Sequence, residues 1–168
     1  MWTTSTSCSR TERRRGLSNL PVVLLGMNNP HSARPDTALL PHPRGCAGHR
    51  LWEMVHEVCG VSRAEYCRLV ERRNLLDART WDYRAAAARV EDAWRTLEGR
   101  RVIFLGATVR RLMWRPVTPP ASWTLDSARN VIWSWLPHPS GLCREYNDPL
   151  VRLAAGMLIE EEMVRASS

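Results

Sequence analysis

The sequence predicts an α/β fold, a three-layer αβα sandwich around a mostly parallel, four-stranded sheet. Two observations lead to this fold class. Residues 21–26 (PVVLLG) and 101–106 (RVIFLG) are short apolar runs that end in glycine and lack the alternation of a half-exposed strand. Such runs are typical of strands buried on both faces of a parallel sheet. Along the chain such runs alternate with segments of helical periodicity, and alternating strands and helices favour a layered α/β sandwich.

The remaining elements follow from local patterns. Residues 49–60 place apolar side chains three or four positions apart and end in glycine, which predicts an amphipathic helix. Ser62 and Glu65 have the spacing of a capping box, which predicts a second helix that runs to about Glu71. We expect further helices at residues 82–97, 107–113 and 149–164, further strands at residues 74–77 and 131–136, and an irregular, Pro-containing segment at residues 115–129.

The length of 168 residues predicts a single domain. Residues 1–19 are rich in Ser and Thr and then in Arg, so we expect a disordered basic arm before a domain at residues 20–168. No apolar run approaches the roughly 20 residues of a membrane helix, and the first residues lack the apolar core of a secretory signal. We therefore expect a cytoplasmic monomer without membrane contact.

The charge balance favours a polyanionic partner. The net charge is +7, and all 24 basic positions are Arg because the chain has no Lys. A basic surface attracts nucleic acid; the alternative is a general bias towards Arg that carries no function. The absence of Lys excludes one class of enzyme, since no side-chain amine can form a Schiff base with a carbonyl substrate.

Two polar loops follow predicted strands. GMNNPH, at residues 26–31, comes directly after the first strand, and PHPSG, at residues 137–141, comes after the last one. In open parallel sheets the ligand crevice lies outside the carboxyl ends of the strands, so we expect the loops to converge on one site. The whole segment at residues 27–48 is long and Pro-rich, which indicates a functional loop.

Four segments carry a resemblance to a known family, and they stand in the family's order at predicted strand and helix junctions. They are GMNNPH at residues 26–31, GCAGHRLWEMV at residues 45–55, VIFLGAT at residues 102–108 and LPHPSGLCR at residues 136–144. The chain resembles the uracil-DNA glycosylase superfamily, most closely its mismatch-specific branch. The resemblance implies a monofunctional enzyme of base-excision repair. Such an enzyme flips uracil or a modified pyrimidine out of DNA and hydrolyses its N-glycosidic bond with water, leaving an abasic site.

The resemblance also implies catalytic residues. Asn28 stands where the family has the residue that positions the hydrolytic water, and His138 stands where a family His donates a hydrogen bond to the base carbonyl O2. This chain departs from the family in having Asn29 before Pro30, so Asn29 is a candidate to share or take over the water-orienting role. His31 lies close to where the classical uracil enzymes have His. The alternatives are a turn residue for Asn28 and solvent-exposed loop histidines.

The end of the same motif resembles the family's DNA-binding loop. Ser140 and Gly141 resemble the part that contacts a DNA phosphate. Leu142 resembles the wedge that fills the gap left by a flipped base, which offsets an unstacking cost of a few kcal/mol. Arg144 resembles the arginine that reaches the opposite strand, and the alternative is a side chain that faces a phosphate or is merely solvated.

One element of the family pattern is missing. Family members usually stack a Phe on the flipped base, in the loop before the GCAGHRLW-like segment, but the only Phe of this chain is Phe104, within a predicted strand. His42 and Arg44 are the candidates to replace the stacking side chain. A pocket with His or Arg at this point would accept a larger or more polar base than uracil.

We expect no metal and no other cofactor. Thermophile-type uracil glycosylases carry four Cys around an iron–sulfur cluster, and the five Cys of this chain do not reproduce that spacing. His42, Cys46 and His49 would supply three ligands for zinc at unusual spacing, and the simpler interpretation places them along a nucleotide pocket.

Two further functions stay open at this point. The chain is either an enzyme, as above, or a catalytically weak DNA-binding relative, because a fold alone does not establish activity. A hydrolase of free modified nucleotides is the third candidate. Leu142 argues against this candidate, because a free nucleotide leaves no base stack to fill.

Overall fold

The computed structural model describes residues 20–168, so the expected basic arm at residues 1–19 lies outside the described residues. The centre of the fold is a five-stranded sheet in the order β2-β1-β3-β5-β4. Its strands are β1 (Val22–Gly26), β2 (Val70–Asn74), β3 (Arg101–Leu105), β4 (Thr124–Asp126) and β5 (Val131–Leu136). β1, β2, β3 and β5 pair in parallel, and β4 pairs antiparallel with β5.

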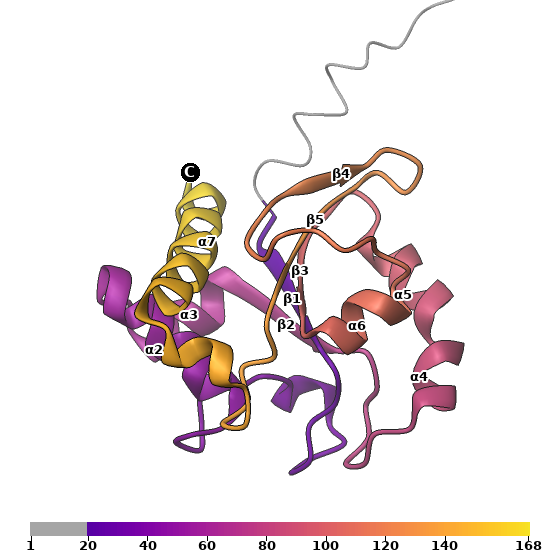
Figure 1. Ribbon diagram of the computed structural model, residues 1–168, viewed down its shortest axis with the longest axis horizontal. Coiled ribbons are helices and arrows are strands. Elements are labelled where there is room, and N and C mark those ends of the chain that lie inside the picture. The colour runs from indigo at the N-terminus through magenta and orange to yellow at the C-terminus, as the bar shows by residue number, and fades with distance from the viewer. Residues whose placement is uncertain (1–19) are drawn as a thin grey trace, which may run out of the picture.

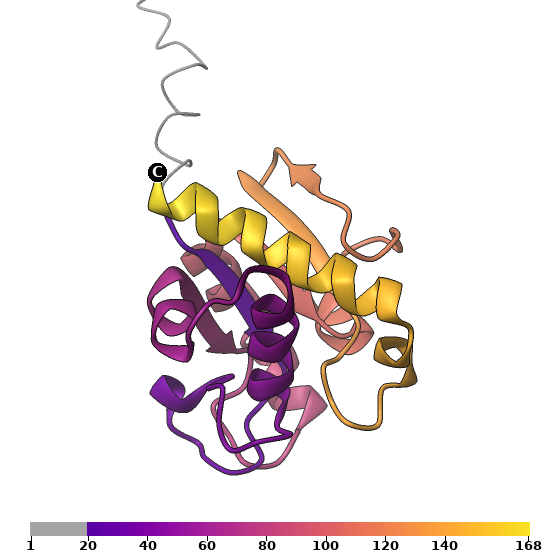
Figure 2. The same ribbon diagram turned by 90° about the vertical axis from the view of Figure 1, so that its left-hand side faces the viewer.

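Helices cover both faces of this sheet (Figures 1 and 2). One face carries α2 (Ala47–Cys59), α3 (Arg63–Leu69) and α7 (Pro149–Ser167), and the other carries α4 (Tyr83–Ala88), α5 (Val90–Leu97) and α6 (Ala107–Leu112). Two short 3-10 helices, η1 (Pro35–Thr37) and η2 (Arg144–Asn147), lie in loops. The described chain is therefore an α/β protein with a mostly parallel sheet, in agreement with the predicted class.

Strand residues alternate between two apolar cores. Val22 and Leu24 pack with the α2, α3 and α7 side, whereas Val23 and Leu25 pack with the α5 and α6 side. All four are almost fully buried. A strand buried on both faces has apolar side chains at every position. This explains why the apolar run in the sequence of β1 is continuous.

The predicted count of four strands is wrong because β4 was not expected, and the bounds of β2 also differ from the prediction. Both strands lie at the edges of the sheet. β4 falls within residues 115–129, which were expected to be irregular. It is only three residues long, and Asp126 closes its turn into β5 by accepting hydrogen bonds from the backbone N–H groups of Ala128 and Arg129. So short an edge strand leaves no hydrophobic pattern in the sequence.

The second edge strand, β2, begins earlier than the predicted strand at residues 74–77. The capping box of Ser62 and Glu65 is present, but the helix that it starts ends at Leu69, two residues before the expected end at Glu71. Glu71 lies in β2 and forms ion pairs with Arg73 and Arg100. A charged residue at this position is therefore compatible with a strand, and does not extend the helix. The predicted single helix at residues 82–97 is also divided, at Arg89, into α4 and α5.

The final helix runs beyond its predicted end at residue 164 to Ser167. It packs closely on α2 at Gly156, where a Cβ would lie 2.4 Å from the carbonyl oxygen of Met54. This contact fixes α2, whose first turn reaches the carboxyl edge of the sheet. Among residues 20–168, no helix is both long and apolar enough to span a membrane.

Candidate functional site

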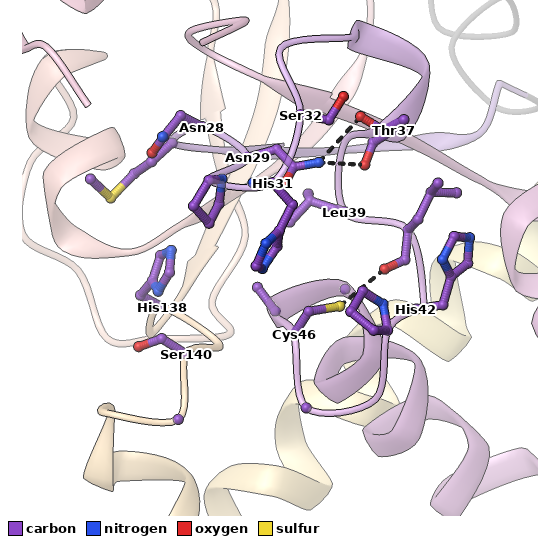
Figure 3. Close-up of a pocket in the computed structure, with 18 residues that line it drawn as sticks. Asn28, Asn29, His31, Ser32, Thr37, Leu39, His42, Cys46, His138 and Ser140 are labelled. Atoms are coloured by element: carbon purple, nitrogen blue, oxygen red, sulfur yellow. Dashed lines mark hydrogen bonds between the residues drawn. The ribbon is translucent and has the colours of Figure 1, made fainter. Parts of the chain in front are cut away.

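A cavity of about 400 Å³ lies at the carboxyl end of the parallel strands. The segment after β1 and the loop after β5 form opposite parts of its wall (Figure 3), so the two polar loops meet at one site. β3 lies between β1 and β5, and two strand spacings amount to roughly 10 Å. That separation leaves space for a flat ring between the two loops.

Asn28 lies on the β1 side of the cavity. Its side-chain Nδ2 donates hydrogen bonds to the backbone oxygens of Ala78 (3.3 Å) and Arg79 (3.1 Å). These bonds fix the orientation of the amide and leave Oδ1 without a partner among the described residues. Asn28 therefore has a fixed, unpaired hydrogen-bond acceptor on the β1 side of the cavity.

The side chain of Asn29 is engaged within its own loop (Figure 3). Its Nδ2 donates to the backbone oxygen of Thr37 (3.1 Å) and to Thr37 Oγ1 (3.2 Å), and its Oδ1 accepts from the backbone N–H of His31 (3.0 Å). The two bonds to Thr37 tie the loop after β1 to η1, and the bond from His31 closes a turn within the loop. The geometry gives Asn29 a structural task and leaves the free acceptor to Asn28.

His138 is half-buried on the opposite side of the cavity. Burial lowers the pKa of its imidazole below the ordinary value, because the charged form loses hydration. Neither ring nitrogen is hydrogen-bonded to another residue within 20–168. At neutral pH the ring is thus mainly uncharged, and its N–H is a donor available to a bound molecule.

The other predicted site residues divide into two groups. His31 and His42 line the cavity and are solvent-exposed, whereas Arg44 is exposed and is absent from the described residues that line it. Ser140 and Gly141 also line the cavity. Leu142 projects into solvent with 93% of its surface exposed, next to the cavity wall. Arg144 is exposed at the start of η2 and lies outside the lining.

Arg50 is a cation beside the cavity, outside the residues that line it, and the sequence did not single it out. Its Nε donates to the backbone oxygen of Gly45 (3.3 Å), and its Nη2 lies 3.1 Å from where a Cβ on Gly141 would be. Gly45 and Gly141 belong to the two opposing loops, so Arg50 spans them. It has no carboxylate partner in the described part of the chain. The one feature of the sequence that could have indicated this role is the position of Arg50 in the first turns of a helix that begins at the cavity.

Asn74 is a second residue that the sequence did not reveal. It ends β2, and its buried Oδ1 has no hydrogen-bond partner within residues 20–168. A Cβ on Gly26 would lie 2.9 Å from this oxygen and 3.3 Å from Leu39, which lines the cavity. The amide thus lies behind the cavity wall. The misplaced start of β2 concealed its position at a strand end.

The first turn of α2 forms a wall of the cavity with small side chains. Cys46 caps this helix, since its Sγ accepts a hydrogen bond from the backbone N–H of His49 and donates one to the backbone oxygen of Leu40. The ring of His49 is buried, whereas that of His42 is exposed. Across the described residues, no group of three His, Cys, Asp or Glu side chains is arranged to hold a metal ion.

Comparison with known proteins adds no family to this geometry. No protein-family model matches the chain, and no curated protein is significantly similar to it. The fold and the site define an α/β protein with a cavity between two loops at strand ends.

Proposed function

We propose that the protein is a monofunctional DNA glycosylase with a fold of the uracil-DNA glycosylase type. The observation that carries this proposal is the pair formed by Asn28 and His138. A fixed acceptor and an uncharged donor line one cavity from two different strand ends. A reaction that needs a positioned water and a stabilised leaving anion requires this combination.

The chemistry follows from the two side chains. With a pyrimidine in the cavity, the N–H of His138 donates to the carbonyl O2 of the base. As the C1′–N1 bond breaks, its electron pair moves into the base, and this hydrogen bond strengthens as charge develops on O2. Asn28 Oδ1 accepts a hydrogen bond from water and orients its oxygen towards C1′. The water oxygen bonds to C1′, and its surplus proton passes to solvent.

An amide is sufficient for this role because the sugar already carries positive charge when water arrives. A strong base is needed only where water must attack a neutral carbon. The amide of Asn28 is not a strong base near neutral pH, and the reaction does not need one. With no Lys in the sequence, no side-chain amine competes with water for C1′. The product is therefore an abasic site in an uncut strand.

The surroundings of the cavity suit DNA as the substrate. Leu142 is an apolar side chain held in solvent beside the cavity, as a wedge for a vacated base stack would be. Arg50 lies between the two loops without a carboxylate partner in the described chain, as a phosphate contact would. The net charge of +7 adds attraction to a polyanion. One chain carries all of these groups, so we propose a monomer as the active form.

The departure at Asn29 is compatible with activity. Its three hydrogen bonds fix the loop that a proline would otherwise stiffen, so the replacement keeps Asn28 in place. This favours an active enzyme over a weak DNA-binding relative, the second candidate function.

Excision from defined duplexes tests the proposal. Duplexes that carry uracil or a modified pyrimidine are incubated with the protein, and abasic sites are cleaved with alkali. We expect cleavage with wild type and a loss of about 100-fold or more in Asn28→Ala and in His138→Ala. Arg95→Ala, which changes an exposed residue of α5, is the matched control. Salt-sensitive DNA binding without any abasic product would establish the weak relative instead, and faster turnover of mononucleotides would establish the nucleotide hydrolase.

A further inference from the structure

An exposed tryptophan follows the end of α6. Trp114 has 60% of its surface exposed, although its large ring would gain from burial. Its backbone has a φ of 52°, in the left-handed region that bulky residues rarely adopt. The surrounding structure therefore holds this ring in solvent against both its hydrophobicity and its backbone preference. Backbone strain of this kind occurs most often at binding sites.

A cation attaches the ring of Trp114 to the core. The guanidinium of Arg129 lies over the Trp114 ring, 5.8 Å from its centroid, and over the Trp94 ring, 5.0 Å from its centroid. Trp94 is buried, and Arg129 also pairs with Asp126 (3.9 Å). The ring of Trp114 is thus held by a fixed neighbour, and its exposed surface is a pre-formed flat platform.

The segment around this platform has an excess of cations. Residues 107–130 contain four arginines and one acidic residue, Asp126, which two of these arginines share. The other two, Arg110 and Arg111, have no carboxylate partner among residues 20–168. Arg111 is exposed, and its Nε donates only to a backbone oxygen of its own helix (3.3 Å). Its charge is therefore available to an anion in solution.

A flat ring beside uncompensated cations matches one class of partner. A single-stranded nucleic acid offers both phosphates and unpaired bases, and proteins bind it by stacking its bases on aromatic side chains beside positive charge. In a duplex the faces of the bases are covered by neighbouring base pairs. An acidic peptide has the charge but no comparable flat surface. The platform therefore favours an unpaired strand.

The platform is separate from the cavity. α6 begins directly after β3, at the edge of the sheet that carries the cavity (Figure 1), and its six residues span roughly 9 Å. Arg111, Trp114 and Arg129 are not among the residues that line the cavity. Binding at the platform therefore does not require a base in the cavity.

We propose that Trp114, Arg111 and Arg129 form a second binding site, which takes single-stranded DNA. Trp114 stacks on an unpaired base, and the two arginines contact phosphates next to that base. The choice of DNA over RNA rests on the proposed glycosylase function. The stacking and the charge contacts do not depend on that function.

Binding of a short, fluorescein-labelled DNA strand of adenines tests the proposal by fluorescence anisotropy. This strand has no pyrimidine for the cavity, so excision plays no part. We expect Trp114→Ala to raise Kd about ten-fold, and Trp114→Phe, which keeps a flat ring, to recover most of the loss. Tyr83→Ala removes a side chain that is 62% exposed on α4, and this control is expected to keep the wild-type Kd. Equal Kd values for Trp114→Ala and wild type, or no binding by wild type, would overturn the proposal.

The salt dependence of the same binding tests the phosphate contacts. Arg111→Gln is expected to reduce the slope of log K against log salt by about 0.7, the value for one phosphate contact on a single strand. Arg95→Gln, which changes an exposed arginine paired with Asp92, is expected to keep the slope. A wild-type slope in Arg111→Gln, at a melting temperature near that of wild type, would overturn the charge contact and the proposed site with it.

Two further measurements separate this site from the cavity. Tighter binding of an RNA strand of adenines would overturn the choice of DNA, and a loss of binding in Arg50→Gln but not in Trp114→Ala would place the strand at the cavity instead. Trp114→Ala is expected to excise bases from a duplex at the wild-type rate. Excision without strand binding would thus overturn this inference alone. Strand binding that depends on Trp114, in a protein that excises no base, would support this site and overturn the glycosylase function.

Discussion

Gly106 leaves the space that His138 occupies. A Cβ on Gly106 would lie 3.1 Å from the Cβ of His138, and the backbone of Gly106 has φ +94° and ψ 149°. This combination of angles is essentially restricted to glycine. The end of β3 therefore both permits and limits the position of the proposed leaving-group donor on the loop after β5.

Replacement of this glycine is predicted to act on the reaction as well as on stability. Gly106→Ala should destabilise the protein by roughly 1–3 kcal/mol and lower kcat by about ten-fold, because the methyl group displaces His138. Gly60→Ala is the matched control: it also has a positive φ, of +70°, but a Cβ there would have no other atom within 4 Å. Chemical denaturation and excision rates of both variants check this. A kcat for Gly106→Ala equal to that of the control would show that the contact is not functional.

A carboxylate at position 28 is predicted to be worse than the natural amide. Asp cannot donate the two hydrogen bonds that Asn28 gives to the backbone oxygens of Ala78 and Arg79, and its charge would face both oxygens. We expect Asn28→Asp to melt a few degrees lower and to excise bases more slowly than wild type at pH 7. Both quantities are measured on the same preparation. A faster enzyme at pH 7 would mean that the side chain acts as a base and not as a fixed acceptor.

The stability of the protein should fall when His138 is protonated. Burial lowers the pKa of His138 in the folded state below its ordinary value of 6.5, so the unfolded chain binds more protons as pH falls through that value. This contribution to stability is complete above about pH 6.5 and is lost on further acidification. Burial acts to raise the pKa values of Glu71 and Asp126, but hydrogen bonds from arginines outweigh it and lower both pKa values. These two carboxylates therefore lose their contributions to stability only near pH 4 and below.

The comparison of melting temperatures at pH 7.5 and pH 5.5 measures this effect. We expect the drop between the two pH values to be smaller in His138→Gln than in wild type, since glutamine does not titrate. An equal drop in both proteins would assign the acid sensitivity to other groups.

Arg50 is predicted to contact a DNA phosphate. Arg50→Gln should weaken binding to duplexes of any sequence and reduce the slope of log K against log salt by about one. Arg95, which lies on α5 and pairs with Asp92, provides the control variant Arg95→Gln. Binding is measured by fluorescence anisotropy between 50 and 200 mM salt, the range over which phosphate contacts have large effects. Equal slopes for Arg50→Gln and wild type would remove the phosphate contact.

The sequence predicted the parts of the fold that depend on continuous apolar runs. β1, β3 and β5 lie where such runs occur, because each is buried on both faces and nearly every residue meets a core. β2 and β4 lie at the edges, where Glu71 and Asp126 form ion pairs and hydrogen bonds with distant residues. Those contacts cannot be recognised from a local pattern.

The site shows the same division. The convergence of the loops after β1 and β5 follows from the rule for parallel sheets, and the cavity contains residues of both loops. The internal bonds of Asn29 and the bridging position of Arg50 depend on how a long loop folds over the first turn of α2. Single positions in the sequence carry no signal for such contacts, so these two roles became visible only in the structure.

Intact-mass analysis of the DNA strands tests the central claim most directly. A duplex with one 5-hydroxymethyluracil is incubated with wild-type protein and with the double variant Asn28→Ala, His138→Ala. We predict that the modified strand loses the base and gains a water, stays uncut before alkali, and is left unchanged by the double variant. An unchanged strand mass with wild type, repeated with uracil and with 5-(glucosyloxymethyl)uracil, would contradict the assignment as a DNA glycosylase.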